Sequence, residues 1–187
     1  MIRLAKLTDA AQLNKIYQYY IENTSITFEY DVISDEEFQN RMKKIMEKYP
    51  YLVYEQDGIV LGYAYANSFK NRKAYDWSVE TTIYLDVNAK GKGIGRQLYE
   101  ALEYCLKKQN ILNMNACISY TEHENEHLDN TSMYFHEKMG FQLVGTFHKC
   151  GYKFNEWVDM IWMEKFIGEH KNNMEEVIPF VNIKLVK

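Results

Sequence analysis

The chain of 187 residues has only three cysteines and two prolines, and it lacks long apolar or basic runs. Its cysteines, Cys105, Cys117 and Cys150, are odd in number and show no paired spacing. This excludes a disulfide scaffold and favours free thiols in a reducing cytoplasm. The apolar runs are a few residues long, far short of a membrane span, and Met1–Leu4 begins no signal peptide. We therefore expect a cytoplasmic protein without a membrane partner.

The chain has a small excess of acidic over basic residues. Asp and Glu number 26 against 22 Lys and Arg, which gives a formal net charge of -4. Because no long block of basic residues is present, we expect no nucleic acid partner. Hydrophobic residues make up 47% and charged residues 26%, a composition typical of a globular protein, and the length suits one domain with a full core.

The apolar periodicity predicts alternating strands and helices. Strands are expected at about 2–4, 51–55, 59–67, 79–87, 114–119, 142–148 and 158–163. Helices are expected after a Thr8–Asp9 cap, after a Ser34–Glu37 capping box and after the glycines near 95, with a short helix that ends at Met139. Pro179 with residues 180–186 is compatible with either an added edge strand or a dimer contact. The expected class is α/β.

A glycine-rich loop follows the central strand. Three glycines alternate with other residues and lead directly into an amphipathic helix, in the order Lys90, Gly91, Lys92, Gly93, Ile94, Gly95, Arg96. This order directs free backbone N–H groups and the positive end of the helix dipole at one point. Two lysines and one arginine add positive charge. The loop therefore indicates a phosphate-binding site on a chain with no general affinity for anions.

The spacing of the glycines separates the kinds of phosphate loop. A Walker loop requires Ser or Thr after Gly-Lys, and none follows here. A dinucleotide fingerprint requires a third glycine at the position of Arg96, so that motif is absent as well. A glycine-rich helix entry that binds no ligand stays open as the simpler alternative.

The segment Lys90–Gly95 resembles the pyrophosphate loop of the GNAT superfamily of N-acetyltransferases, with Lys90 in place of the usual Arg or Gln. The segment 132–141 resembles the second signature of that family, a short helix that ends in Lys-x-Gly-Phe before a strand. Further stretches resemble the phosphinothricin N-acetyltransferase branch, namely Thr27–Glu29, Tyr63–Tyr65 with Phe69, Arg72, Tyr75, Trp77 and Glu80, and Gly151–Lys153 with Trp157 and Asp159.

The resemblance implies a single GNAT domain over residues 1–165, with a mixed, mostly antiparallel sheet flanked by helices, and leaves 166–187 as an extension. It implies acetyl-CoA as co-substrate, no metal and a homodimer. The acceptor would be the primary amine of a small amino acid such as methionine sulfone, methionine sulfoximine or phosphinothricin. The implied acetyl-CoA contacts are Ile83, Tyr84, Leu85, Lys90, Gly91, Lys92, Gly93, Ile94, Gly95, Arg96, Asn130, Ser132, Phe135 and Lys138.

Glu80 is the expected general base. It interrupts an apolar and hydroxyl-bearing strand, where a carboxylate is unexpected without a purpose. Its position matches the catalytic Glu of the branch, which would act through a water. The alternative is a carboxylate at the strand end that faces solvent or pairs with Arg72.

His136 stands where many family members carry the Tyr that protonates the leaving thiolate, and a histidine titrates near neutrality. The alternative is a ring that only packs beside the cofactor. The usual family Asn, seven residues earlier, is Asp129 here, and Asn130 follows one place late. For the acceptor, the resemblance and the aromatic clustering indicate Phe28, Glu29, Arg72 and Tyr75, with Arg72 on the substrate carboxylate.

Other classes of function stay open with less support. His123–His127 fits the zinc-protease pattern H-E-x-x-H, but the polar flanks lack the apolar face that would bury such a helix. A non-catalytic acyl-CoA-binding module is a second alternative, and retention of Glu80 argues against it. An acetyltransferase for a polyamine, an antibiotic or a protein is a third.

Overall fold

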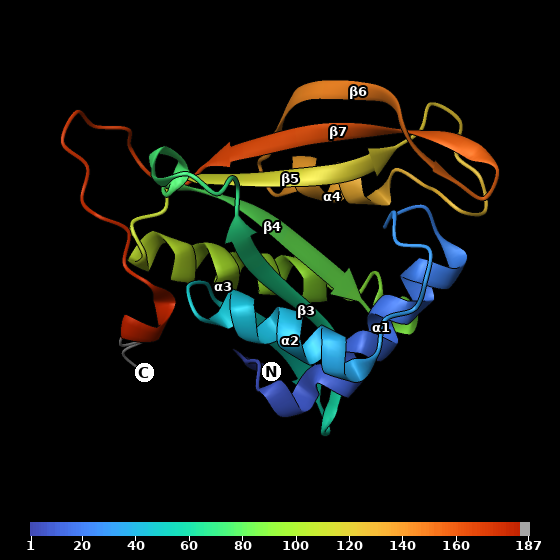
Figure 1. The fold of residues 1–187 in the computed structure, drawn as a ribbon, viewed down its shortest axis with the longest axis horizontal. Helices are drawn as coiled ribbons and strands as arrows, with labels where there is room; N and C mark the ends of the chain where they lie inside the picture. Colours follow the sequence, from blue (N-terminus) through green and yellow to red (C-terminus); the bar gives the residue numbers. More distant parts are fainter. Residues whose placement is uncertain (184–187) are drawn as a thin grey trace.

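Seven strands form one sheet in the order β1-β2-β3-β4-β5-β7-β6 (Figure 1). The computed structural model describes residues 1–183. The strands are β1 (Ile2–Leu4), β2 (Tyr51–Gln56), β3 (Ile59–Ser68), β4 (Ser78–Leu85), β5 (Asn113–Tyr120), β6 (Gln142–Lys153) and β7 (Glu156–Phe166). All neighbours pair antiparallel except β4 and β5, which are parallel. The predicted α/β class with a mixed, mostly antiparallel sheet is confirmed.

Helices cover both faces of the sheet. They are α1 (Ala10–Asn23), α2 (Asp35–Met46), α3 (Ile94–Lys108) and α4 (Thr131–Lys138). The alternation of strand side chains decides which helix each face meets. Tyr51 and Tyr63 pack with the α1–α2 layer, whereas Leu52 and Ala64 pack with α3. Within the described part of the chain, no helix combines the length and the apolar character needed to cross a membrane.

The two predicted caps have different outcomes. The Ser34 hydroxyl accepts the Glu37 N–H at 3.1 Å, as predicted for the start of α2. Asp9 precedes α1, but its carboxylate does not cap that helix. It accepts the Lys6 N–H at 2.7 Å and two bonds from the Arg3 guanidinium, at 2.7 and 2.9 Å. The half-buried guanidinium competes successfully for the carboxylate because a bidentate charged pair is stronger than a neutral cap.

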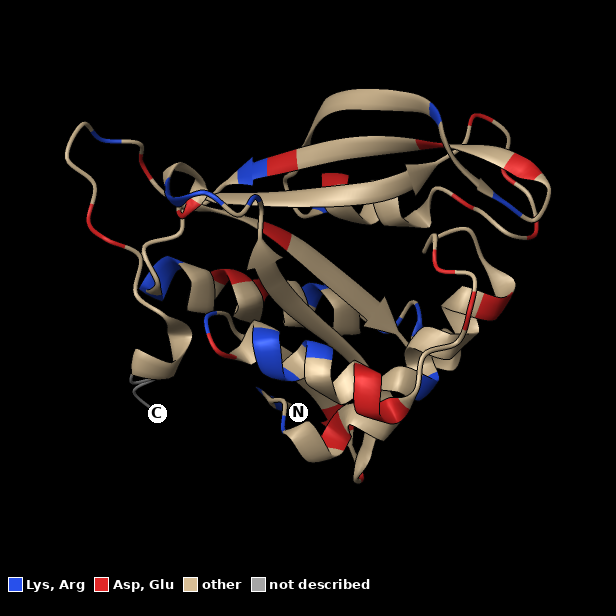
Figure 2. Cartoon of the chain, in the orientation of Figure 1, with Lys and Arg blue, Asp and Glu red and all other residues tan. Residues whose placement is uncertain are grey.

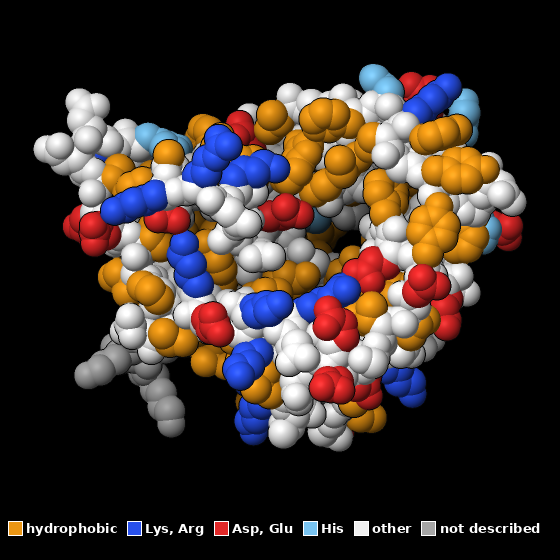
Figure 3. Space-filling model, viewed as in Figure 1, with side chains coloured by type: hydrophobic (Ala, Val, Ile, Leu, Met, Phe, Trp, Pro, Cys, Tyr) orange, Lys and Arg blue, Asp and Glu red, His pale blue; other side chains and the backbone are white. Residues whose placement is uncertain are grey.

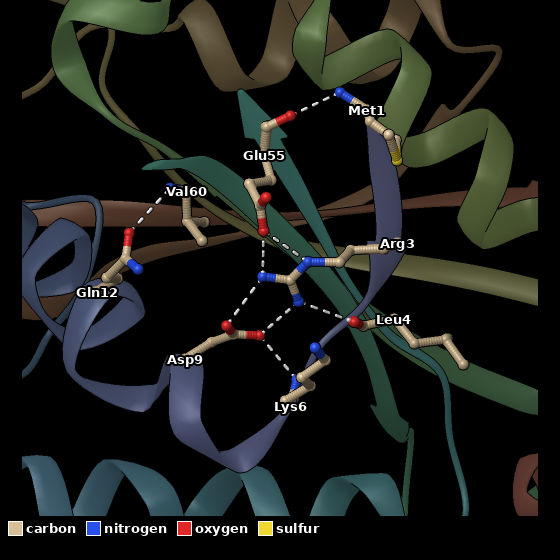
Figure 4. Close-up of polar contacts among 8 residues, drawn as sticks. All are labelled: Met1, Arg3, Leu4, Lys6, Asp9, Gln12, Glu55 and Val60. Carbon is tan, nitrogen blue, oxygen red and sulfur yellow. Dashed lines mark hydrogen bonds and ion pairs between the residues drawn. The ribbon is translucent and has the colours of Figure 1, made fainter. Parts of the chain in front are cut away.

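Arg3 joins the first strand to two other segments (Figure 4). Besides Asp9, it donates to the Glu55 carboxylate in β2 at 2.7 Å, and the Met1 ammonium donates to the Glu55 carbonyl at 2.6 Å. Burial raises the pKa of Asp9, but the bonds from Arg3 and from the Lys6 amide outweigh burial and leave that pKa below its usual value. This network fixes the short edge strand β1 beside the start of α1.

The hairpin of β6 and β7 is longer than predicted. Phe154 and Asn155 form its two-residue turn, with φ of 51° and 61°. Positive φ at both central residues is the pattern of a type I′ turn, which matches the twist of a hairpin. The usual Asn-Gly or Asp-Gly signal is absent, so the sequence did not indicate the turn. The strands therefore continue to Lys153 and from Glu156.

The described part of the extension folds back on the domain. Residues Phe180–Asn182 form a 3₁₀ helix, so the first of the two alternatives, an added edge strand, does not form in this part, and residues 184–187 lie outside the described residues. Ile178 exchanges main-chain and side-chain bonds with Gln109 at the end of α3, and the buried Phe180 donates its N–H to the Lys48 carbonyl. These contacts satisfy backbone groups that a strand would otherwise have to pair.

Candidate active site

The site is built where β4 and β5 separate. The two strands pair only over Ser78–Glu80 and Asn113–Asn115, and beyond these residues they diverge (Figure 1). A cavity of about 280 Å³ lies between them, here called the β4–β5 cavity. Figure 3 shows the molecule hollowed between the part that holds β5–β7 and the part that holds α1 and α2. Its walls include Glu80, Thr81, Thr82, Ile83 and Tyr84 of β4, Ala116–Ser119 of β5, and Phe28, Tyr99, Ser132, His136 and Met160.

Two side-chain bonds hold the point of divergence. The Asn115 amide donates to the Val79 carbonyl at 3.0 Å, and the Thr81 hydroxyl donates to the Asn115 carbonyl at 3.1 Å. On its other edge β4 stays paired with β3 as far as Leu85. The main-chain groups of Thr81–Leu85 that face β5 therefore have no ladder partner there. They are available to a ligand, since buried backbone groups require partners.

The glycine loop has the backbone that the sequence predicts. Gly91 and Gly93 have φ of 75° and 74°, and a Cβ at either would meet no atom within 4 Å. Gly93 is the N-cap of α3, so the first N–H groups of that helix face the open space. Gly95 serves another purpose, because a Cβ there would lie 3.2 Å from the Phe135 ring. Two glycines thus shape the loop, and the third lets α3 approach α4.

The cationic side chains of the loop differ in their surroundings. Lys90 Nζ lies 5.3 Å from the centre of the Tyr20 ring, and the Tyr20 hydroxyl donates to the Leu85 carbonyl at 2.7 Å. Tyr20 thereby connects the loop to the end of β4. Lys92 is exposed, and the ion pair that Arg96 makes among residues 1–183 is a long one, 3.8 Å from Glu100. The loop, the helix end and these cations make an anion site that fits a diphosphate.

Glu80 lies on the wall of the β4–β5 cavity, at the point where the two strands separate. Figure 2 marks the acidic position in β4, and β4 contains no other acidic residue. Burial raises the pKa of Glu80, and the positive charge of Lys70 opposes that rise. A carboxylate with a raised pKa is a better proton acceptor than an exposed one. Among the described residues Glu80 has no ion pair with Arg72, so that alternative is not what the structure shows.

His136 is buried at the α3 side of the cavity. Its Nδ1 lies 2.7 Å from the Ser132 carbonyl, and its Nε2 lies 2.8 Å from the Tyr99 hydroxyl. Burial lowers the pKa of His136 to about 4, so the ring is neutral at pH 7. A carbonyl only accepts, which places the ring proton on Nδ1 and makes Nε2 the acceptor of the Tyr99 hydroxyl. Both nitrogens are thus engaged, and the role of His136 as acid stays a prediction.

The other α4 residues divide into two groups. Ser132 lines the cavity, and Phe135 packs on Gly95 of the loop. Lys138 is exposed. The cofactor contact expected of Asn130 stays a prediction, and the structure shows its side chain bonded within the loop before α4. Its amide nitrogen donates to the Thr121 carbonyl at 2.9 Å and its oxygen accepts the Thr121 N–H at 3.4 Å, so the side chain closes the loop before α4.

The predicted acceptor residues are not all brought together. Phe28 lines the cavity with Glu80. Glu29 instead ion-pairs with Arg41 of α2. Tyr75 packs on Phe69 in the β3–β4 loop, and Arg72 is exposed there with only main-chain bonds among the described contacts. In this structure the charge nearest Glu80 from that loop is Lys70, which lies over the Trp162 ring.

Lys153 anchors the segment that carries Phe28, and sequence reasoning assigned it no role. Its ammonium donates to the carbonyls of Ile21, Thr24 and Thr27, at 2.7, 2.8 and 2.9 Å. Two of these carbonyls belong to the C-terminal end of α1, where a cation is favourable. At Gly151 the Phe28 ring occupies the space that a Cβ would need. The family resemblance included the segment Gly151–Lys153, and this was the one feature of the sequence that drew attention to Lys153.

The zinc-protease pattern does not form its required geometry. Residues 121–130 form a loop and no helix. His127 stacks on Phe154 with ring centres 3.9 Å apart, and Glu124 accepts the Asn130 N–H at 2.9 Å. Within residues 1–183, no group of three or more metal-ligating side chains is present.

Diverging parallel strands, a glycine loop at a helix start and a half-buried carboxylate suit the transfer of an acyl group from acetyl-CoA. The acetyltransferase (GNAT) domain family matches residues 2–162, and the chain belongs to this family. It is 32% identical over 166 residues to phosphinothricin N-acetyltransferase of Streptomyces viridochromogenes, covering 88% of this chain and 87% of that protein. The predicted resemblance to the family and its phosphinothricin branch is confirmed.

Two further comparisons agree. The chain is 26% identical over 170 residues to the L-methionine sulfoximine/L-methionine sulfone acetyltransferase of Salmonella typhimurium, covering 90% of this chain and 95% of that protein. A solved structure of a GNAT superfamily phosphinothricin acetyltransferase from Sinorhizobium meliloti in complex with AcCoA superposes with a TM-score of 0.86, at 33% identity and 96% coverage of each chain.

The pKa of His136 makes stability depend on pH. A histidine in the unfolded chain titrates near 6.5, whereas the folded ring titrates at about 4. Between these values the unfolded chain binds a proton that the folded chain does not. Stability is therefore full above pH 6.5 and falls as the pH is lowered toward 4. The total loss is about 3 kcal/mol, at about 1.4 kcal/mol per pKa unit.

Urea unfolding at pH 7.5, 6.5, 5.5 and 4.5 measures this effect. His136→Gln should flatten the fall in stability, whereas His123→Gln, a change in the exposed loop, should leave it as in the wild type. A His136→Gln variant with the wild-type pH slope would contradict the assignment.

Proposed function

We propose that this protein transfers the acetyl group of acetyl-CoA to the α-amine of a small amino acid with a polar side chain. The observation that carries the proposal is the divergence of β4 from β5. At this one place lie unpaired main-chain groups of β4, the glycine loop and the Glu80 carboxylate. The acetyl-CoA complex of the Sinorhizobium meliloti structure supports the donor. The names of the Streptomyces and Salmonella relatives support the class of acceptor.

The chain's own residues suit each requirement of acetyl transfer. Backbone N–H groups near Leu85 would stabilise the oxyanion that forms on the thioester carbonyl. The loop residues Lys90–Arg96 would hold the diphosphate, with Ser132 and Phe135 beside the arm of the cofactor. Glu80 would take the proton of the attacking amine through a water. The C–N bond forms, the C–S bond breaks, and the thiolate leaves and takes up a proton.

For His136 we propose a positioning role. The ring links the Ser132 carbonyl of α4 to the Tyr99 hydroxyl of α3, so it holds two walls of the β4–β5 cavity at a fixed distance. Its neutral state favours this role over direct proton transfer, since its one proton is given to a carbonyl.

We also propose a homodimer in a reducing cytoplasm. The edge strand β6 carries Leu143, Val144 and Phe147, and Trp157 follows in β7; each of these side chains is more than half exposed. Figure 3 shows hydrophobic side chains gathered over this part of the molecule. An apolar edge of this kind favours a second copy of the chain as its cover, and a monomeric mass in solution would contradict the dimer. The three free thiols fit the compartment.

Acetyl-CoA should stabilise the fold through the glycine loop. A ligand that binds only the folded state at 100 times its Kd adds about 2.7 kcal/mol, so the melting temperature should rise with acetyl-CoA or CoA. Gly93→Val should abolish the rise, because the side chain fills the space in front of the helix N-terminus. Gly58→Val is the matched control, since Gly58 has φ of 78° and equally open surroundings at the tip of the β2–β3 hairpin. No rise at millimolar CoA in the wild type would contradict the donor assignment.

Glu80→Gln should lower the rate of acetyl transfer about 100-fold, the usual scale for a lost general base, with the KM for acetyl-CoA unchanged. Because the pKa of Glu80 is raised in the folded protein, its ionisation destabilises the fold increasingly as the pH rises above 4.5. The variant should therefore melt no lower than the wild type at pH 7.5. Glu22→Gln, on the exposed surface of α1, is the control. Wild-type rates for Glu80→Gln would show that another group is the base.

A further inference from the structure

A second cavity, of about 120 Å³, lies on the α1–α2 side of the sheet and is here called the tyrosine cavity. Its walls include Tyr17, Phe38, Arg41, Tyr51, Tyr63, Tyr65, Thr82 and Tyr84. Thr82 and Tyr84 belong to the walls of both cavities, so the two spaces are neighbours across the same segment of β4.

Two hydroxyl groups in this cavity have no partner. Tyr51 and Tyr63 are 3% and 1% exposed, and within residues 1–183 neither phenol oxygen makes a hydrogen bond. The neighbouring phenol of Tyr17, in contrast, bonds the Thr27 hydroxyl at 2.8 Å. Tyr51 stacks on Tyr65 with ring centres 4.7 Å apart, which fixes the ring and directs its hydroxyl. The buried side-chain atoms without a partner in residues 1–183 are Asn14 Oδ1 and Gln109 Oε1, so the two phenol oxygens, which are not among them, each keep accessible surface that a ligand in the cavity can reach.

The charged side chain in the wall of the tyrosine cavity is Arg41, whose guanidinium ion-pairs with the carboxylates of Glu29 and Glu37. Both carboxylates lie outside the lining, so the polar groups that line the cavity include a guanidinium and phenol hydroxyls. A guanidinium and two phenol hydroxyls are donors, so together they fit a ligand group with several acceptor oxygens.

The position relative to Glu80 limits the ligand further. Glu80, Thr82 and Tyr84 alternate along β4 and so lie on one face, each about 7 Å from the next. Thr82, a small residue in the walls of both cavities, therefore stands between an amine bound at Glu80 and the tyrosine cavity. We propose that this cavity binds the side-chain oxo group, S=O or P=O, of the acceptor amino acid, with the hydroxyls of Tyr51 and Tyr63 as donors. This inference rests on the proposed function.

The test compares L-methionine sulfone with L-methionine, which lacks the oxo oxygens. Each lost hydrogen bond is worth about 5- to 10-fold, so Tyr51→Phe and Tyr63→Phe should each lower kcat/KM for the sulfone by that factor. Methionine should be unaffected, so the sulfone-to-methionine ratio should fall. The KM for acetyl-CoA should stay constant. Tyr54→Phe is the matched control, because Tyr54 lies on β2 but packs on the opposite face.

Stability separates this role from a structural one. Removing a hydroxyl that has no protein partner should leave the melting temperature of Tyr51→Phe and Tyr63→Phe equal or higher, whereas loss of a structural bond would lower it. Arg41→Met should lower kcat/KM for the anionic side chain of phosphinothricin more than for the neutral sulfone. An unchanged sulfone-to-methionine ratio in both Phe variants would overturn the proposal.

A binding measurement keeps the proposal independent of catalysis. In the presence of CoA, calorimetric titration of Glu80→Gln with methionine sulfone should show binding that Tyr63→Phe, added to this variant, weakens 5- to 10-fold. If the wild type transfers acetyl to no amine but this titration still shows the effect, the proposed function fails and the subsite stands. If transfer occurs but neither the titration nor the ratio responds, the subsite fails alone.

Discussion

The parallel contact of β4 and β5 ends after three residue pairs, and this limit shapes the rest of the site. A strand that leaves its neighbour exposes main-chain groups which no other strand satisfies. Here the exposed edge of β4 faces a cavity, and the side-chain bonds of Thr81 and Asn115 keep the divergence at one point. The glycine loop directly follows this edge, so a ligand can use both the strand and the helix start.

Burial sets the charges around this cavity. Burial raises the pKa of the Glu80 carboxyl, and the positive charge of Lys70 opposes that rise. Burial also lowers the pKa of His136, which keeps that ring neutral. Carboxylate and imidazole therefore differ in function although both line one space. The first is a stronger proton acceptor than an exposed carboxylate. The second joins α4 to α3 through its hydrogen bond with the Tyr99 hydroxyl.

Local features of the chain were predictable from the sequence. Positive φ at Gly91 and Gly93 follows from residue type, and a carboxylate in an apolar strand singled out Glu80. The α/β class followed from periodicity, and the mixed, mostly antiparallel sheet followed from the family resemblance. These predictions depended on neighbours in sequence or on a whole pattern.

Contacts between distant segments were not predictable. Lys153 finds its carbonyls 126 to 132 residues earlier, and the Tyr99–His136 bond spans 37 residues. The tyrosine cavity draws on five elements, so no spacing rule indicates it. The two bonds between the Asn130 side chain and the Thr121 backbone, which close the loop before α4, were not indicated by the sequence either.

The central claim is that this protein acetylates the α-amine of a compact, oxo-bearing amino acid. A screen of CoA thiol release over methionine sulfone, methionine sulfoximine, phosphinothricin, polyamines and aminoglycosides tests it most directly, with the acetylated position found by mass spectrometry. The account predicts release with the three amino acids and a product acetylated on the α-nitrogen. Release only with polyamines or aminoglycosides, or with none of these amines, would contradict it.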